Sequence, residues 1–504
     1  MGMARVILIW PTDVSKQSAL YPPLGLASLA AVLKQTSHNV SVIDLSFDDN
    51  WSHLHSLDER GAIYGISFTS SLYTNTKKCI EIIRNKDQDA KIVLGGPHPS
   101  VLPEATLNEM DADVVCIGEA EISFPMVVDA LINGSDLAEI PGIAFRNTDE
   151  AKDIVLTPAV ETICDLDALP IPDQSLFPYK RYFKEKGFRE LSIVTSRGCP
   201  GSCTFCQPTL RKMFGRKIRY SSSDHVINQI RYLKERFKLD FFVISDDTFV
   251  SRKRRVMDVC GRIISEKLYV FWRCQTRIDL LDREMIRMLK KAGCFVIALG
   301  VESGSQAILD GLRKNVKVEK IKEVFRICHE EGMLTHAYLM IGNIGETWQT
   351  INQTKELLSE IKPFSSNICV TTPYPGTHLY ETLLEKGQIE EKNWDTYDHL
   401  LSDTVHVKSS SFDLATLNEF KAVLLYVQRY PLFKLRCLCR AFLNWNTMRR
   451  FICVLYSNPG ILFRGLRLFG KSLFAKGLQL SNPKTRAYET YCQSPTSDTE
   501  SPSR

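Results

Sequence analysis

The sequence contains no apolar run as long as the roughly 18 residues that a membrane-spanning helix needs. No secretory leader is expected, because the apolar part of Met1–Trp10 is short and has the composition of a β-strand. The 15 cysteines are irregularly spaced, and without a leader they do not indicate a disulfide framework. These absences argue against an integral membrane protein and a disulfide-rich secreted one, and they predict a cytoplasmic location.

Negative charge is missing from one long stretch, Lys421–Leu480, which holds eleven Lys or Arg residues and no Asp or Glu. Since the whole chain has a net charge of +5, this basic segment contributes +11 and the remainder −6. Its cations are interleaved with Phe, Leu and Ile, a composition typical of an amphipathic helix on anionic lipid, which predicts peripheral membrane contact through residues 421–480. The alternatives are a helical cap on the rest of the protein and a nucleic-acid contact, which the absence of a recognisable binding module disfavours.

Residues 1–145 alternate short runs rich in Val and Ile with stretches of helical periodicity such as Leu24–Leu33. The runs are Val6–Trp10, Val40–Leu45, Ala62–Phe68, Lys91–Leu94 and Asp113–Ile117. Apolar strands alternating with helices predict a parallel sheet covered on both faces, as in a doubly wound, Rossmann-like α/β domain. Such sheets bind ligands at the carboxyl ends of their strands.

A Pro-rich stretch at Leu166–Asp173 indicates that residues 146–188 are a linker. A second alternation follows over residues 189–385, with helical periodicity at Asp224–Phe237 and Val318–Glu331. Its apolar runs are Leu191–Thr195, Phe241–Ser245, Val270–Gln275, Phe295–Leu299, Thr335–Ile341 and Ser366–Thr371. Six strand–helix units predict a partial (β/α)6 barrel with its chemistry at the carboxyl ends of the strands. Residues 386–480 are predicted to be helical, and residues 481–504, rich in Ser, Thr and Pro, to be a disordered tail.

Cys199, Cys203 and Cys206 follow the first strand of the second alternation with the spacing C-x3-C-x2-C. Thiolates are soft ligands that select zinc, Cu(I) or iron–sulfur clusters. A structural zinc site would need a fourth ligand, and no second pair of cysteines follows nearby. Three thiolates instead suit a [4Fe–4S] cluster in which one iron stays open to a substrate or cofactor.

The cysteine motif resembles the signature of the radical S-adenosylmethionine (SAM) superfamily. The resemblance implies that the three thiolates hold a [4Fe–4S] cluster whose open iron binds SAM and reduces it to a 5′-deoxyadenosyl radical. It also implies contacts to SAM from residues at the later strand ends, which are Asp246, Asp247, Arg277, Glu302, Ser303 and Gly342. On the third strand, Arg273 and Gln275 are further candidates, and a structural ion pair is the alternative role for the arginines.

The first domain resembles the cobalamin-binding domain that precedes many radical SAM barrels. The resemblance lies in Tyr21-Pro22-Pro23-Leu24-Gly25-Leu26, Gly95-Gly96-Pro97-His98 and Gly118-Glu119-Ala120-Glu121. It implies that cobalamin contacts Pro23, Gly25, Ser67, Gly95, Gly96, Gly118 and Glu119. The D-x-H-x-x-G motif whose histidine ligates cobalt in other cobalamin enzymes is absent, so we expect cobalamin without a protein imidazole. His98, which lies between two prolines, is interpreted as a turn residue rather than a ligand.

Together the two resemblances cover residues 1–385 and imply a cobalamin-dependent radical SAM methyltransferase. Such an enzyme uses one SAM to methylate the cobalamin and another to make the radical that activates an unreactive carbon. The alternatives are a non-methylating enzyme of the anaerobic magnesium-porphyrin cyclase type and a cobalamin- or SAM-binding regulator. The implied partners are a small-molecule, lipid or tetrapyrrole substrate and an electron donor such as flavodoxin or ferredoxin, and no nucleic acid is expected.

Overall fold

The computed structural model describes the chain from residue 3 to residue 442 with short gaps, together with Met448 and Ile452. The described ranges are 3–12, 21–48, 50–57, 59–147, 153–206, 209–215, 217–389, 393–397, 412–428 and 430–442. The chain divides into a compact unit over residues 1–450 and a second unit over residues 451–504. Ile452 is the only described residue of the second unit, so the predicted tail at 481–504 and most of the basic segment lie outside the described residues.

The first sheet has seven strands in the order β2-β1-β3-β4-β5-β6-β7. Its strands are β1 (Arg5–Trp10), β2 (Asn39–Asp44), β3 (Ile63–Ser67), β4 (Lys91–Gly95), β5 (Val114–Cys116), β6 (Ile143–Arg146) and β7 (Ile154–Leu156). The first five pair in parallel and coincide with the five predicted strands. The last two add antiparallel pairs that the sequence did not predict, and β7 lies within the stretch interpreted as a linker.

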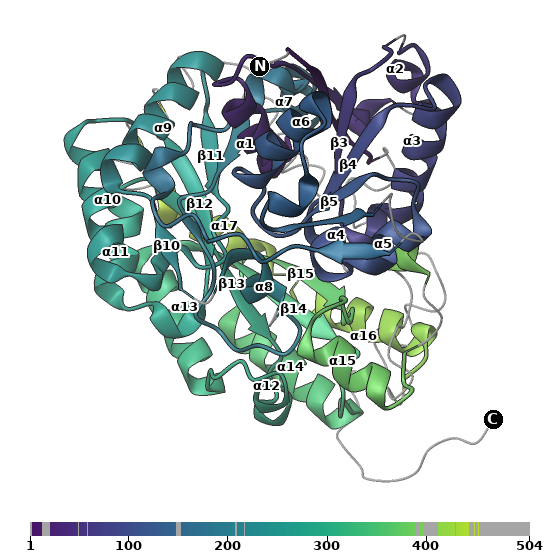
Figure 1. Cartoon of the computed structure of the whole chain (residues 1–504). Coiled ribbons are helices and arrows are strands. Elements are labelled where there is room, and N and C mark those ends of the chain that lie inside the picture. The colour runs from purple at the N-terminus through teal and green to yellow at the C-terminus, as the bar shows by residue number, and fades with distance from the viewer. Residues whose placement is uncertain are drawn as a thin grey trace. The chain divides into compact units, whose positions relative to one another are not determined.

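Helices cover both faces of the first sheet, as the apolar strands predicted (Figure 1). They are α1 (Leu24–Leu33), α2 (Ser52–His55), α3 (Tyr73–Lys86), α4 (Pro97–Val101), α5 (Pro103–Glu109) and α6 (Ser123–Asn133). Alternate residues of β1 enter separate cores: Ile7 and Ile9 belong to one, and Val6 and Leu8 to the other. The strand is therefore buried on both sides, which explains why it reads as a continuous apolar run.

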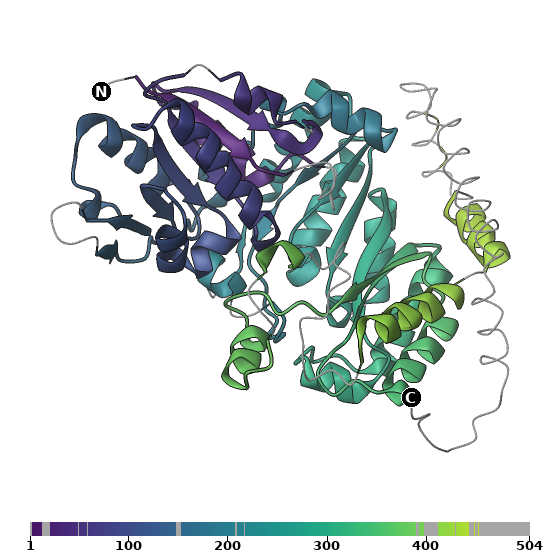
Figure 2. The ribbon, with the colours of Figure 1, turned by 90° about the vertical axis from the view of Figure 1, so that its right-hand side faces the viewer.

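The second sheet has six strands, all paired in parallel, in the order β15-β14-β13-β12-β11-β8. They are β8 (Glu190–Ile193), β11 (Phe241–Ile244), β12 (Phe271–Thr276), β13 (Cys294–Glu302), β14 (Leu334–Ile341) and β15 (Ser365–Val370). Because β8 and β15 are edges that do not pair with each other, the curved sheet is an open partial barrel, and the predicted α/β architecture is confirmed (Figures 1 and 2).

Helices pack on one face of this sheet around a single large core. They include α9 (Ser223–Phe237), α10 (Lys253–Ser265), α11 (Arg283–Lys291), α13 (Val318–Glu331) and α14 (Trp348–Ile361), with the shorter α12 (Gln306–Gly311) and α15 (His378–Glu385) nearby in sequence. The Ser222 side chain caps α9 by accepting a hydrogen bond from the His225 amide, and Gly332 ends α13 with φ +66°. These local signals explain why the predicted boundaries of α9 and α13 agree closely with the structure.

The remaining helices and strands lie in the chain before the second sheet, between its strands β8 and β11, or after its last strand. They are α7 (Tyr179–Lys186), the antiparallel pair β9 (Ser196–Arg197) and β10 (Arg219–Tyr220), α8 (Thr209–Phe214), α16 (Leu414–Tyr426) and α17 (Pro431–Phe442). The linker is thus partly helical, and the predicted helical region at 386–480 begins with the single turn Trp394–Thr396 before α16. Among the described residues, no helix has both the length and the apolar character needed to span a membrane.

Candidate cobalamin cavity and cysteine site

A cavity of about 420 Å³ lies at the carboxyl ends of the parallel strands of the first sheet. Its lining includes all seven residues that the family resemblance assigned to cobalamin, namely Pro23, Gly25, Ser67, Gly95, Gly96, Gly118 and Glu119. Residues of the barrel half of the chain also line it, among them Val194, Arg197 and Asp247. A volume of this size is ordinary for a cofactor or small-molecule site, and the position at the strand ends is the expected one.

Glycines give the cavity an edge without side chains. No heavy atom lies within 4 Å of the position that a Cβ on Gly25 would take, and the nearest to a Cβ on Gly95 is the Cys116 carbonyl oxygen at 3.9 Å. Gly96 has φ +96°, and a Cβ there would lie 2.7 Å from Ser67 Oγ. A broad edge of exposed backbone fits a flat ring such as a corrin, which side chains at these positions would displace.

His98 lies in the core and does not line the cavity. Its Nδ1 is 2.9 Å from Ser70 Oγ, and its ring stacks on Phe68 and meets the edge of Trp394. Burial lowers the pKa of His98 to about 4, so the imidazole is neutral at physiological pH. The side chain is therefore a packing element of α4, and it offers no nitrogen to a ligand in the cavity.

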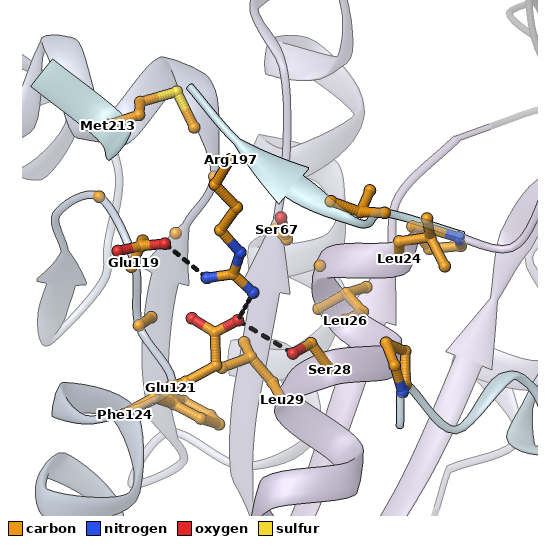
Figure 3. Close-up of a pocket in the computed structure, with 18 of the residues that line it drawn as sticks. Leu24, Leu26, Ser28, Leu29, Ser67, Glu119, Glu121, Phe124, Arg197 and Met213 are labelled. Carbon is orange, nitrogen blue, oxygen red and sulfur yellow. Dashed lines mark hydrogen bonds and ion pairs between the residues drawn. The ribbon is translucent and has the colours of Figure 1, made fainter. Parts of the chain in front are cut away.

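A buried ion-pair network joins the cavity wall to the segment just before the cysteines (Figure 3). The Arg197 guanidinium lies 2.5 Å from a Glu119 oxygen and 2.6 Å from a Glu121 oxygen, and Ser28 Oγ donates to the same Glu121 oxygen at 2.9 Å. Arg219, the β10 partner of Arg197, pairs with Glu119 at 2.7 Å. Burial opposes ionisation of Glu121, but Arg197 lowers the pKa of its carboxyl below the usual value.

Glu119 thus lines the cavity, but two arginines already engage its carboxylate. Sequence reasoning singled out this glutamate and missed Arg197 and Arg219, which lie on either side of the cysteine motif. The only available signal was the presence of two acidic residues in Gly118-Glu119-Ala120-Glu121, because a buried carboxylate pair requires cations nearby. We refer to Arg197, Arg219, Glu119 and Glu121 below as the clamp.

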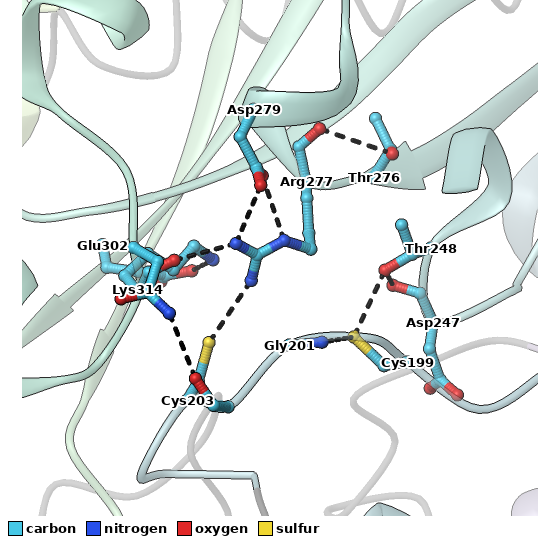
Figure 4. A network of polar contacts seen from close by, with 12 residues as sticks. Cys199, Gly201, Cys203, Asp247, Thr248, Thr276, Arg277, Asp279, Glu302 and Lys314 are labelled. Atoms are coloured by element: carbon cyan, nitrogen blue, oxygen red, sulfur yellow. Dashed lines mark hydrogen bonds and ion pairs between the residues drawn. The ribbon is translucent and has the colours of Figure 1, made fainter. Parts of the chain in front are cut away.

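The cysteine loop follows β9, and Gly201 allows its thiols to approach one another (Figure 4). A Cβ on Gly201 would lie 3.4 Å from Cys199 Sγ, 3.7 Å from Cys203 Sγ and 2.8 Å from an Arg277 nitrogen. The Gly201 amide and Thr248 Oγ1 each lie 3.4 Å from Cys199 Sγ, and Arg277 donates to Cys203 Sγ at 3.6 Å. The loop therefore brings two thiols and a guanidinium together around one glycine.

The surroundings of the loop favour a thiolate. A hydrogen bond with the Cys206 thiol, together with the positive charges of Lys314 and Arg277, lowers the pKa of Cys203 to about 6 against the effect of burial. The same hydrogen bond, added to burial, raises the pKa of Cys206. Anionic sulfur is the form that binds metal, so this donor set suits a thiolate-bound cluster.

In the described part of the chain, no three His, Cys, Asp or Glu side chains converge closely enough to hold one metal ion. A [4Fe–4S] cluster places a different iron at each thiolate, so its ligands lie farther apart than those of a single ion. The three cysteines on one short loop, with cations beside them, fit such a cluster better than a mononuclear site.

Arg277 and Glu302 lie beside the cysteine loop. Asp279 holds the Arg277 guanidinium through two contacts of 3.0 and 3.1 Å, and the Lys314 carbonyl accepts from it at 2.8 Å. Lys314 Nζ lies 2.6 Å from Glu302 Oε1. Burial opposes the charge of Lys314, but Glu302 and Cys203 raise its pKa above the ordinary value. Lys314, which the sequence did not single out, is thus a second buried cation near the thiols.

The other residues predicted to contact SAM occupy different surroundings. Asp247 lines the cavity. Its pKa is raised to about 6, mainly by burial and to a lesser extent by the negative charge of the neighbouring Asp246. Asp246 is buried and accepts hydrogen bonds from Thr195 and from Ser196 Oγ. Ser303 is buried against Thr354, and Gly342, with φ +78°, donates its amide to Glu346. Gln275 donates to the Asp246 carbonyl at 3.2 Å.

Arg273 belongs to a different cluster of polar side chains. It donates to the Tyr21 hydroxyl at 2.5 Å and lies 3.5 Å from a Glu190 oxygen. Both strand-three arginines thus form the structural ion pair given as the alternative: Arg273 with Glu190, and Arg277 with Asp279, while Arg277 also contacts a thiol.

The sequence matches the model of the radical SAM superfamily over residues 193–358 and that of the B12 binding domain over residues 14–128. An uncharacterised methyltransferase of Pyrococcus horikoshii is 29% identical over 407 residues, which are 79% of this chain and 87% of the relative. An anaerobic magnesium-protoporphyrin IX monomethyl ester cyclase of Rubrivivax gelatinosus is 26% identical over 401 residues, 76% of this chain and 71% of the cyclase.

Among solved structures, the radical SAM methyltransferase TsrM of Kitasatospora setae, with cobalamin and a [4Fe–4S] cluster bound, superimposes with a TM-score of 0.66 at 18% identity. The match covers 76% of this chain and 75% of TsrM, and it shows a shared fold. Both predicted domain types are therefore present. The cofactors that these domains imply are the predicted ones: a [4Fe–4S] cluster, SAM and cobalamin.

Proposed function

We propose that this chain, whose sequence matches the models of the radical SAM superfamily and of the B12 binding domain over separate segments, methylates an unactivated carbon of a small-molecule substrate. One observation carries the proposal. The cavity lined by the glycines of the first sheet extends to Asp247, whose neighbour Thr248 contacts Cys199. A corrin on the glycine edge and a cluster on the cysteine loop would thus share one active site.

In the proposed enzyme, Cys199, Cys203 and Cys206 anchor the cluster, and Arg277 and Lys314 balance its negative charge. Glu302 and Asp247 are the carboxylates that would meet the ammonium group of SAM, and the Pro23–Gly25 turn with Gly95, Gly96 and Gly118 holds the corrin. When bound, the cofactors supply the radical and the methyl group. The protein orients them and excludes water, which the apolar lining of the cavity favours.

The runner-up is a cyclase without methyl transfer, which the likeness to the magnesium-protoporphyrin cyclase supports. The likeness to the Pyrococcus horikoshii methyltransferase supports methylation. Either reading allows a tetrapyrrole or another large apolar substrate. A cobalamin- or SAM-binding regulator is disfavoured because a sensor has no use for three thiolates beside two buried cations. Flavodoxin or ferredoxin is the proposed electron donor, and low-potential chemical reductants would replace it in vitro.

Methyl-labelled SAM separates methylation from cyclisation. Anaerobically reconstituted protein with hydroxocobalamin, reductant and SAM carrying a CD3 group is analysed by mass spectrometry of the bound corrinoid. A methylating enzyme places the intact CD3 group on cobalt and turns over further SAM to 5′-deoxyadenosine. Formation of 5′-deoxyadenosine while the corrinoid stays unlabelled would favour the cyclase reading.

We further propose that the basic segment, residues 421–480, contacts anionic lipid at the periphery of a cytoplasmic membrane surface. The described part of this segment supports both alternatives. In α17, Phe433 packs against His329, and Arg440 donates to the His329 carbonyl, as in a cap. Leu435 on the same helix is 49% exposed. The apolar positions and the eleven cations together suit an interfacial helix.

Vesicle cosedimentation of the full chain tests this contact. Each well-placed cation contributes about 1 kcal/mol at an anionic surface, so replacing Arg464, Arg467 and Lys471 by Gln should weaken binding strongly. Binding should also fall with added salt, because the Debye length is about 10 Å at 0.1 M. If the full chain stays in the supernatant with anionic vesicles at low salt, the lipid contact is refuted and the segment is a helical cap on the rest of the protein.

A further inference from the structure

Part of the cavity lining comes from α9 of the radical SAM domain and from the connecting stretch before it. His225 and Gln229 lie one helical turn apart on α9 and both line the cavity. Leu166 and Leu169 of the connecting stretch line it as well. This part of the wall is thus apolar except for the side chains on one face of α9.

Gln229 is the unusual member of this wall. It is only 3% exposed, and its Oε1 has no hydrogen-bond partner among the described residues. A buried amide without a partner destabilises the fold, and native proteins rarely keep one without a reason. Gln174 offers a comparison: its Oε1 is also unpaired and it is 1% exposed, but it does not line the cavity, and its Nε2 donates to the Ser192 carbonyl at 3.0 Å.

The chemistry of the wall indicates what completes it. An amide both donates and accepts, so its best partner is another amide. A ligand carboxylate here would place a negative charge against Leu166 and Leu169, and one of its lone pairs would face the Gln229 oxygen. Asp167 Oδ1 also lies 3.9 Å from His225 Nδ1, so a second carboxylate beside this face of α9 would be disfavoured. The wall therefore selects a neutral carboxamide on an otherwise apolar ligand.

Cobalamin carries carboxamide side chains around the edge of its corrin ring. We infer that Gln229 binds one of these carboxamides, so that the radical SAM domain itself selects a fully amidated corrin over corrinoids with free carboxylates. This inference rests on the proposed function, because it takes cobalamin as the occupant of the cavity. It assigns a specificity-determining residue to a helix that belongs to the barrel and not to the B12-binding domain.

Corrinoid titration of the purified full chain tests the assignment without any turnover. Gln229→Leu removes both hydrogen bonds and should raise the Kd of hydroxocobalamin roughly tenfold. Cobinamide, which keeps the ring amides but lacks the nucleotide, should lose affinity by the same factor. A corrinoid with carboxylates in place of the amides should bind wild type more weakly than cobinamide, and Gln229→Leu should reduce that preference.

Two further variants keep the test independent of folding. Gln229→Glu preserves the shape of the side chain, but an ionised carboxylate cannot donate a hydrogen bond. This variant should therefore bind hydroxocobalamin more weakly than wild type, and its affinity for the carboxylate corrinoid should fall further. Gln174→Leu, the matched control, should lower the melting temperature but leave every Kd unchanged.

Wild-type affinity in Gln229→Leu would overturn the inference while the methyltransferase proposal stands. A loss confined to hydroxocobalamin, with cobinamide unaffected, would also overturn it, because Gln229 would then contact the nucleotide. If wild type retained no corrinoid at all, the inference and the cobalamin part of the proposed function would both fail.

Discussion

The cavity of the first sheet and the cysteine loop after β9 make room for a ligand in different ways. Along the cavity, the room comes from missing side chains, because Gly25 and Gly95 leave open space where a Cβ would stand. Around the cysteines, charged side chains fill the space: Arg277 touches a thiol, and Lys314 pairs with Glu302. The cavity suits a large ring held by shape, and the loop suits charged groups held by electrostatics.

This contrast teaches that the two regions should fail under different perturbations. Added bulk should empty the cavity and leave the loop intact, whereas removal of a thiolate or a charge should disable the loop and leave the cavity intact. The clamp is the exception, because Arg197 reaches from the segment just before Cys199 to the cavity residue Glu119. Changes to the clamp should therefore be felt on both sides.

The largest expected effect comes from replacing Cys199, Cys203 and Cys206 together by Ala. Without thiolates no cluster assembles, so SAM cleavage and the broad visible absorbance of the cluster should be lost completely. Hydroxocobalamin affinity should change by less than about twofold, because none of the three cysteines lines the cavity. Iron analysis, 5′-deoxyadenosine assays and corrinoid titration measure the three effects. Loss of cobalamin binding in this variant would contradict the separation of the two regions.

Gly25→Leu is the reverse experiment. A Cβ on Gly25 has no heavy atom within 4 Å and Gly25 lines the cavity, so cobalamin affinity should fall more than about tenfold while the melting temperature stays close to wild type. SAM cleavage in the absence of cobalamin should be unchanged. Gly311→Leu is the matched control, since a Cβ there also has nothing within 4 Å but Gly311 does not line the cavity. Equal affinities in the two variants would refute the glycine edge.

Arg197→Gln tests the clamp. The side chains of Arg197 and Glu119 are 16% and 2% exposed, and breaking such a buried pair destabilises a fold by about 3–5 kcal/mol. Urea unfolding of the metal-free protein should show this loss, and cobalamin affinity should fall as well because Glu119 lines the cavity. Arg283→Gln removes ion pairs with Glu330 and Glu331 at the surface and should change stability far less than Arg197→Gln. Similar losses of stability and of cobalamin affinity in both variants would mean that the buried ion pairs of the clamp contribute no more than exposed ones.

The smallest effect is a pH dependence of opposite sign from one buried group in each half of the chain, Glu346 and His98. Burial raises the pKa of Glu346, in the turn after β14, from 4.5 to about 7. Its stabilising contribution is therefore complete below about pH 4.5 and is lost as the pH rises through 7, by at most about 3 kcal/mol. The depressed pKa of His98, about 4 instead of 6.5, gives a contribution that is lost as the pH falls through 4.

Unfolding curves of Glu346→Gln between pH 4.5 and pH 7 isolate the first of these effects. This variant should lose less stability than wild type as the pH rises over that interval, because its side chain does not titrate. An unchanged slope would mean that another group controls the pH dependence. His98→Gln is the companion variant at acid pH. There, its free energy of unfolding should change with pH differently from that of wild type, whereas Glu346→Gln should follow wild type.

Much of this architecture was predictable because each strand of the two parallel arrays and most helices carry a local signal. Apolar runs identified eleven parallel strands, and Ser222 and Gly332 marked helix ends. The strands β6 and β7, which add antiparallel pairs at one edge of the sheet, were missed. The glycine motifs located the cavity because a backbone-lined site depends on few long-range contacts.

The polar part of the site was less predictable because its pairings are made across the fold. Arg197 and Glu119 are 78 residues apart, and Arg219 and Glu119 are 100 apart, so no local pattern links them. Asp246 and Ser303 illustrate the opposite problem. Each has a side chain suited to a charged ligand, but tertiary contacts engage both with neighbouring Thr and Ser residues. Residue type at a strand end could not distinguish these uses.

SAM cleavage by the reconstituted protein tests the central claim most directly. The purified full chain is loaded anaerobically with iron and sulfide, reduced, and given SAM, and 5′-deoxyadenosine is quantified against protein that has not been loaded. The account predicts 5′-deoxyadenosine only in the loaded, reduced sample, with none formed when the three cysteines are replaced by Ala. A fully loaded, reducible cluster that yields no 5′-deoxyadenosine, or product that persists in the triple variant, would contradict it.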